Sequence, residues 1–148
     1  MKMSLAYAGR TLLLACGVFL AVGIVLSGIG PALPALAARS GQDVAALGAL
    51  FTALSAGVVL TQLIVGRASD RWGLPAVLAA GMAVMALGAL LLALGASLLA
   101  LLLAALLAGI GFGGVLAAGN VLVARLFPAR SAATLNGANV FFGLGSIA

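Results

Sequence analysis

Long apolar runs, separated by isolated charged residues, restrict the fold of this chain more than any other feature. Only 6% of the 148 residues are charged and 66% are hydrophobic, whereas a soluble domain is usually about a quarter charged. Too few polar side chains are present to cover a surface that faces water. Because a helix that spans the bilayer needs about 20 apolar residues, these runs predict an all-α integral membrane protein.

We expect five membrane-spanning helices, which lie between the charged and helix-breaking residues of the chain. Their predicted ranges are residues 11–37, 44–65, 75–96, 98–127 and 132–148. Five spans divide the seven basic residues six to one between the two sides of the membrane. Arg39 lies alone on one side, and the other side holds Lys2, Arg10, Arg67, Arg71, Arg125 and Arg130. Since basic residues concentrate in cytoplasmic loops, we expect a multi-pass protein of a cell membrane with a cytoplasmic N-terminus.

The two ends of the sequence each need an interpretation. The first apolar run follows Lys2 and Arg10, as in a secretory signal peptide, but it is longer than the about 7–15 apolar residues of such a peptide. We therefore interpret it as a span. The last run, residues 132–148, is still apolar where the sequence stops and lacks the polar flank that anchors a helix at the far interface. We expect these residues to be one part of a longer chain.

Several classes of function are excluded by the residues that the chain lacks. It has no histidine, and its acidic residues are Asp43 and Asp70 alone, so paired-carboxylate and histidine-based catalysis have no residues to use. Cys16 is the single cysteine and lies inside an apolar run, where a small buried side chain is the simplest interpretation. The net charge of +5 is scattered and not gathered into a basic stripe. We expect no enzyme activity, no metal or cofactor, and no nucleic-acid partner.

Small residues in the fourth predicted helix form a candidate packing face. Gly109, Gly113, Ala117 and Asn120 recur at i, i+4, i+8 and i+11, which places them on one side of a helix. The segment also fits G-x-G-x-x-G, but no strand precedes it and no acidic residue follows it, so a dinucleotide site is dismissed. Small residues allow another helix to approach closely. We expect Gly109, Gly113 and Ala117 to pack against a neighbouring helix.

Three asparagines are candidates for a solute-binding cavity. Asn120 shares the small-residue face, and Asn136 and Asn139 are i, i+3 neighbours in the fifth predicted helix. Asn139 lies nine residues beyond Arg130, about 13 Å at 1.5 Å per residue, which is near the midplane of the bilayer. Polar side chains at that depth face partners, water or substrate. Lining of a cavity and hydrogen bonding between helices both remain open, whereas for Thr52 and Ser55 the second interpretation is preferred.

The segment from Gly66 to Pro75 resembles the signature loop of the major facilitator superfamily, G-x-x-x-D-R-x-G-R/K-R/K. Gly66, Asp70, Arg71 and Gly73 match it in order and spacing, and the two trailing basic residues are replaced by Leu74 and Pro75. From the residues themselves, we expect Gly66 to give a tight exit from the second helix and Pro75 to begin the third. The resemblance implies that this loop is a gate, which docks against the second half of the protein in one state of transport.

A second resemblance, to the fucose-permease-like sugar branch of the superfamily, rests on Asn120, residues 126–130, Leu135-Asn136 and residues 141–145. The membrane-embedded acids of sugar:proton members are missing from the first and fourth helices. The two resemblances imply an incomplete N-terminal six-helix half of a major facilitator fold. They also imply secondary transport of a small polar solute, a sugar-like metabolite or a drug, by alternating access.

The partners implied are the lipid bilayer, a small-molecule substrate and the missing C-terminal half. The alternative from another class of function is a small oligomeric membrane scaffold or assembly protein without transport activity, which would use the small-residue faces of its helices for association.

Overall fold

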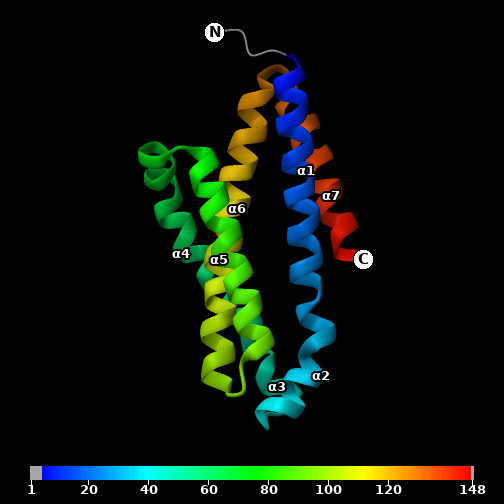
Figure 1. Cartoon of the computed structure of the whole chain (residues 1–148), viewed down its shortest axis with the longest axis vertical. Coiled ribbons are helices and arrows are strands. Elements are labelled where there is room, and N and C mark those ends of the chain that lie inside the picture. The colour runs from blue at the N-terminus through cyan, green and yellow to red at the C-terminus, as the bar shows by residue number, and fades with distance from the viewer. Residues whose placement is uncertain (1–4, 148) are drawn as a thin grey trace. The chain divides into compact units, whose positions relative to one another are not determined.

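The described part of the chain is helical throughout its regular structure. The computed structural model describes residues 5–147, with side chains from residue 9 on, so Lys2 and Ala148 lie outside the described residues. The elements are α1 (Leu5–Ser27), α2 (Ile29–Ser40), α3 (Val44–Leu47), α4 (Ala49–Trp72), α5 (Leu74–Leu94), α6 (Leu98–Leu126), the 3-10 turn η1 (Pro128–Arg130) and α7 (Ser131–Ile147) (Figure 1). Residues 5–147 contain no strand, and the all-α prediction is confirmed.

Four segments of the described chain are long and apolar enough to cross a membrane. They are Gly9–Ser40, Val44–Trp72, Leu74–Leu94 and Leu98–Leu126. The fifth predicted span is occupied by helix α7, which has 17 residues and continues to the last described residue.

The first span is interrupted at Gly28, between α1 and α2. The last regular bond of α1 joins the Gly28 amide to the Ile24 carbonyl, at 3.1 Å. Because α2 starts afresh at Ile29, Pro31 falls in its first turn, where amide groups have no partner within the helix and a proline costs little. Pro34 lies inside α2. The break at Gly28 thus places Pro31 at the start of a helix. In one continuous helix, Pro31 would remove a backbone hydrogen bond.

The second helix ends later than the sequence indicates. The predicted end is residue 65, whereas α4 continues to Trp72 and stops at Gly73, which has φ +83°. Gly66 lies within the helix, so the expectation that it makes the exit from the helix is wrong. The helix ends at the positive φ of Gly73, a backbone conformation that favours glycine. Pro75 lies in the first turn of α5 as expected.

The chain divides into two compact units. Unit 1 comprises Met1–Gly30 and Asn120–Ala148, and unit 2 comprises Pro31–Gly119. In unit 1, α1 and α7 pack along one another at a pair of glycines. A Cβ atom added to Gly23 would collide with the Phe142 carbonyl oxygen, and one added to Gly145 would collide with the Leu20 carbonyl oxygen. The two backbones therefore approach as closely as glycine allows.

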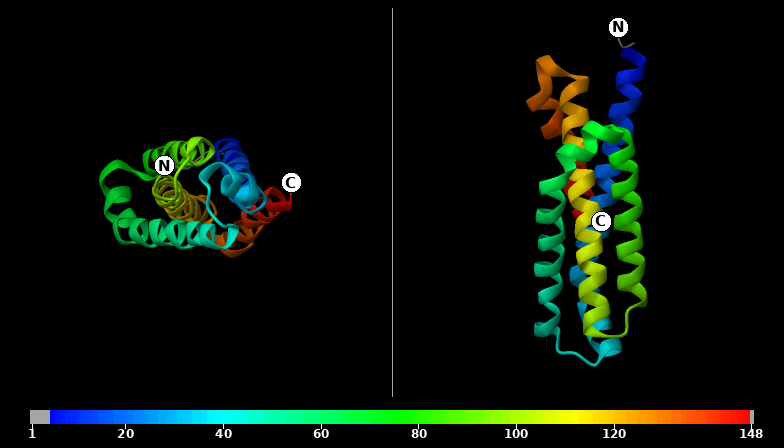
Figure 2. Two further views of the ribbon diagram at one scale, coloured as in Figure 1. Left: turned by 90° about the horizontal axis from the view of Figure 1, so that it is seen from below. Right: turned by 90° about the vertical axis from the view of Figure 1, so that its left-hand side faces the viewer.

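In unit 2, α6 lies between α4 and α5 and presents glycines to both (Figure 2). Toward α4, a Cβ at Gly109 would strike the Leu54 carbonyl oxygen, and one at Gly113 would lie 2.9 Å from Cβ of Thr61. Toward α5, a Cβ at Gly111 would lie 2.6 Å from the Gly81 carbonyl oxygen. Since none of these backbone positions can yield easily, larger residues would push the helices apart.

Arg39 ties α2 to α5 within unit 2. Its guanidinium donates hydrogen bonds to the carbonyl oxygens of Leu92 (2.9 Å), Ala93 (2.6 Å) and Gly95 (2.9 Å). The last carbonyls of a helix have no partner within the helix, and they carry the negative end of the helix dipole. One arginine therefore satisfies three such acceptors at the end of α5.

Candidate functional site

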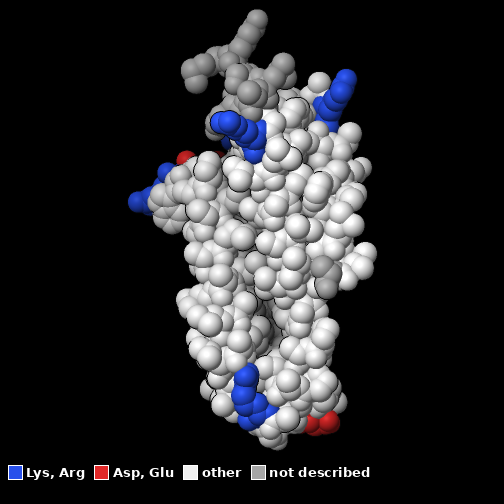
Figure 3. All heavy atoms as spheres, turned by 45° about the vertical axis from the view of Figure 1, so that its right-hand side comes forward, with Lys and Arg blue, Asp and Glu red and all other residues white. Residues whose placement is uncertain are grey.

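The turn between α4 and α5 carries most of the charge of unit 2. Arg67, Asp70 and Arg71 are exposed residues of the last two turns of α4, and Gly73 alone separates the two helices. Arg71 lies in the last turn of α4, where a cation favourably meets the helix dipole. Among residues 5–147, Asp70 forms no ion pair with either arginine. On the face shown in Figure 3, charged atoms lie toward the helix ends and the surface between them is uncharged.

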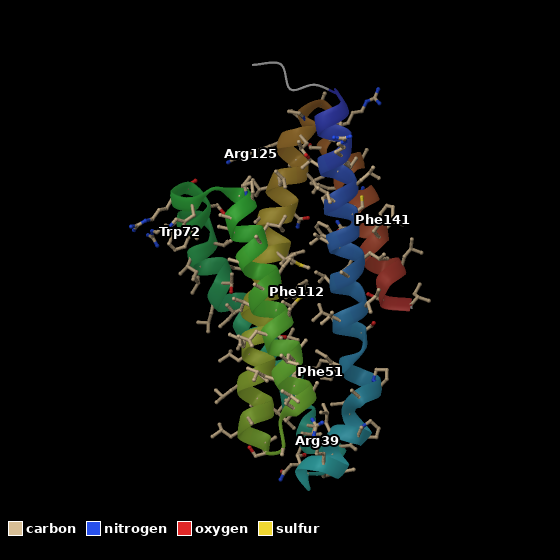
Figure 4. The ribbon with its side chains drawn as sticks, in the orientation of Figure 1. Arg39, Phe51, Trp72, Phe112, Arg125 and Phe141 are labelled. Carbon is tan, nitrogen blue, oxygen red and sulfur yellow. The ribbon has the colours of Figure 1, made fainter. Side chains whose placement is uncertain are left out.

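Trp72 closes this turn and is 66% exposed. The guanidinium carbon of Arg71 lies 6.0 Å from the centroid of its ring, at the outer limit of a cation–π contact. Trp72 and Arg39 lie at opposite ends of unit 2 (Figure 4). Helix α5 begins just after Trp72 and ends at the carbonyl groups that Arg39 contacts. A tryptophan next to exposed arginines is typical of the level of the lipid headgroups.

The four signature residues do not form a loop in this structure. Gly66, Asp70 and Arg71 lie in helix α4, and Gly73 makes the turn itself. Asp70 is three residues before Gly73, in the last turn of α4, where the helix dipole favours Arg71 and not a carboxylate. The charged residues are thus held on a rigid helix end, and the backbone freedom is concentrated at Gly73.

The three candidate cavity residues all fall in unit 1. Asn120 lies in α6, and its Oδ1 atom is buried without a hydrogen-bond partner. Asn136 and Asn139 are exposed on α7. The structure forms no hydrogen bond among the three side chains within the described residues. An unsatisfied buried amide oxygen costs free energy, so Asn120 is the residue of this set whose chemistry is least accounted for by the fold.

Of the predicted packing residues, Gly109 and Gly113 lie against α4. Their nearest neighbours across the interface are Leu54, Val58 and Thr61. Ala117 is partly exposed. The small-residue pattern therefore places the first two residues at a helix–helix contact within unit 2.

Sequence reasoning missed Thr61, which is the polar residue buried most deeply in the described chain, at 7% exposed. Its hydroxyl oxygen lies 3.1 Å from the Gly57 carbonyl oxygen within α4 and 2.9 Å from the Ile110 carbonyl oxygen of α6. The available signal was the spacing of Gly57 and Thr61 at i and i+4, a small residue beside a hydroxyl.

The sequence predicts helix contacts through Thr52 and Ser55, which lie on the face of α4 opposite Thr61. Thr52 and Ser55, expected to bond between helices, are exposed, as is Gln62. The residues that α4 buries are Leu50, Gly57, Thr61 and Val65. The polar side chains of α4 do not predict which of its faces is buried, because close contact between helices requires small side chains and only occasionally a hydrogen bond.

Three clefts occur in the described residues, one in unit 1 and two in unit 2; the larger cleft of unit 2, about 560 Å³, lies at the turn between α5 and α6 and includes Leu91, Gly95 and Leu107. In unit 1, a cleft of about 360 Å³ lies between α1 and α7 and includes Cys16, Arg130 and Thr134. In unit 2, a cleft of about 300 Å³ is lined by α4, α5 and α6, with Trp72 among its residues. The described residues contain no group of three or more His, Cys, Asp or Glu side chains that would hold a metal ion.

Comparison with known proteins gave one positive finding. A search of curated proteins and a search of solved structures returned no match. A sequence model of the Major Facilitator Superfamily matches residues 12–148, which includes parts of both units.

Proposed function

The chain belongs to the major facilitator superfamily, and from that premise we propose that it serves the secondary transport of a small polar solute by alternating access. The observation that carries this proposal is the family match over residues 12–148, which covers nearly the whole sequence. Members of this family are secondary transporters embedded in a membrane by several apolar helices. The family match does not favour the scaffold alternative.

We assign the gating role to the end of α4. Asp70 and Arg71 are exposed on a helix end that is followed by the single-residue turn at Gly73. A charged, rigid helix end can exchange partners between two states without refolding, provided that the second half of the transporter offers complementary groups. The alternative is that these charges only orient the protein in the membrane.

We assign the solute cavity to the asparagines of unit 1. The buried and unpartnered Oδ1 of Asn120 supports this assignment, because a polar solute can supply the missing donor. Asn136 and Asn139 add amide groups on α7. The resemblance of residues 126–130 and Asn136 to the sugar branch extends the proposal to a sugar-like solute.

An uptake assay tests the proposed function. The complete reading frame that contains these residues is purified and reconstituted into liposomes, and entry of radiolabelled sugars and other small polar metabolites is measured. We expect saturable entry of at least one solute above protein-free liposomes. Folded, correctly inserted protein that moves none of them would overturn the proposal.

The gating assignment is tested by Asp70→Asn, with Asp43→Asn as the matched control. Both acids are exposed residues of unit 2, but Asp43 precedes the short helix α3 at the other end. We expect Asp70→Asn to reduce transport at least tenfold and to change the balance of inward- and outward-facing states, measured by accessibility of introduced cysteines. The control should stay within twofold of the unchanged protein. If both variants leave transport and the balance of states unchanged, Asp70 has no gating role.

A further inference from the structure

The smaller cleft of unit 2 is suited to an apolar ligand. Its volume is about 300 Å³, and six of its eleven lining residues are alanine or glycine. Thr61 and Trp72 supply the only polar side-chain atoms in that lining. The Thr61 hydroxyl is already hydrogen-bonded to two backbone carbonyls. A polar solute would therefore lose its hydration in this cleft and gain little in return.

Basic residues lie next to Trp72, at one end of the same cleft. Trp72 lines the cleft, and the Arg71 guanidinium lies 6.0 Å from its ring centroid. Arg67 precedes Arg71 by four residues, so both arginines lie on one face of α4. Asp70 reduces the local charge to +1, yet it pairs with neither arginine within the described residues. Two exposed cations thus lie at the end of α4 that also supplies Trp72 to the cleft, although neither arginine lines it.

We propose that this cleft binds one acyl chain of an anionic phospholipid, whose phosphate group contacts Arg67 and Arg71. Basic pockets between membrane helices are known to hold anionic lipid headgroups. The tryptophan at this end of the cleft belongs at headgroup level. The charge at this end and the apolarity of the interior together match a lipid that is anionic at one end and hydrocarbon at the other.

The dimensions of the cleft also match an acyl chain. From Ala76 to Val84 the lining follows α5 for eight residues, about 12 Å at 1.5 Å per residue. This is close to one leaflet, which is half of a hydrocarbon core of about 30 Å.

The small residues explain why the cleft exists. Gly81 and Gly111 allow α5 and α6 to touch, whereas Ala68 on α4 and Ala76 and Ala80 on α5 are too short to fill the space between their helices. A bound acyl chain would supply the missing contacts and hold the end of α4 beside α5. Lipid binding is therefore expected to stabilise the protein, independently of any transported solute.

The experiment uses purified full-length protein in a neutral detergent, with phosphatidylglycerol or phosphatidylcholine of identical acyl chains added in turn. Bound lipid is counted by native mass spectrometry, and thermal stability is measured in parallel. We expect phosphatidylglycerol to bind at least tenfold more tightly. Arg67→Gln and Arg71→Gln should each weaken its binding about fivefold, since each cation near an anionic lipid contributes about that factor.

Filling the cleft provides the decisive comparison. Ala80→Phe places a large ring in the cleft, whereas Ala83→Phe changes an exposed alanine of the same helix that does not line it. We expect the first variant to lose phosphatidylglycerol binding at least tenfold and the second to retain it. Ala76→Leu, a milder change, serves if Ala80→Phe does not fold. Equal binding by both variants would overturn the proposal, and so would equal affinity for the two lipids. Cross-linking of an Ala76→Cys variant to another protein chain would also overturn it.

Discussion

Single residues decide how the ends and contacts of these helices are satisfied. Thr61 was not distinguished in the sequence because hydroxyl residues are common in membrane helices. The structure buries it where its hydroxyl meets the Ile110 carbonyl oxygen across the α4–α6 contact. The sequence indicates Arg39 only as a marker of orientation. In the structure its guanidinium caps the end of α5 by donating hydrogen bonds to three carbonyl oxygens. Both roles depend on which helix packs against the residue, and the type of a residue alone does not reveal that neighbour.

We expect Arg39→Gln to destabilise the protein by about 1–2 kcal/mol, because hydrogen bonds from a charged donor to three unpaired carbonyls are lost. Arg39→Lys should recover only part of this, since an ammonium cannot reproduce the planar fork of donors. Arg10→Gln, which removes an exposed arginine of α1, is the control and should change stability by less than about 0.5 kcal/mol. Unfolding is followed in mixed detergent micelles, and equal losses for Arg39→Gln and Arg10→Gln would show that the cap is unimportant.

At the scale of the element, the sequence predicts that the chain is helical, but it does not predict where α4 ends or which face of α4 is buried. The all-α class followed from the long unbroken apolar runs, because a helix satisfies its backbone within one segment in lipid, whereas the strands of a membrane barrel are shorter and alternate in polarity. The prediction ends this helix at residue 65, before Gly66, whereas α4 continues to Trp72, because an isolated glycine in a helix costs only about 1 kcal/mol. The buried face of α4 was missed because lipid, unlike water, does not force apolar residues inward.

Glycines of α7 give a matched test of close helix packing. Gly145→Ala would drive a methyl group into the Leu20 carbonyl oxygen of α1, whereas a Cβ at Gly143 meets no atom within 4 Å. We expect Gly145→Ala to cost about 1–3 kcal/mol through overpacking. Gly143→Ala should be neutral or stabilise by up to about 1 kcal/mol, because alanine favours the helix. Thermal unfolding of both variants measures the difference, and similar values would mean that the α1–α7 contact yields easily.

At the scale of the whole molecule, the family match spans both units, and the charges of each unit agree with a membrane setting. Within unit 2, Arg71 lies next to Trp72 at one end and Arg39 lies at the other (Figure 4). Within unit 1, the Arg130 side chain lines the same cleft as Leu12 near the start of α1. The candidate site was less predictable than the fold, because the asparagines of unit 1 gain meaning only from neighbours that surround them in three dimensions.

Orientation in the membrane is the property of the whole molecule that its arginines predict, and cysteine labelling tests it. In a Cys16→Ser background, Ser40→Cys lies beside Arg39 and Ser69→Cys lies between Arg67 and Arg71. If the more basic end of unit 2 is cytoplasmic, an impermeant maleimide added to intact cells should label residue 40 and not residue 69. Residue 69 should react only after the membrane is opened. The reverse pattern would mean that the N-terminus faces outward, and it would place Asp70, with its proposed gating role, on the external side.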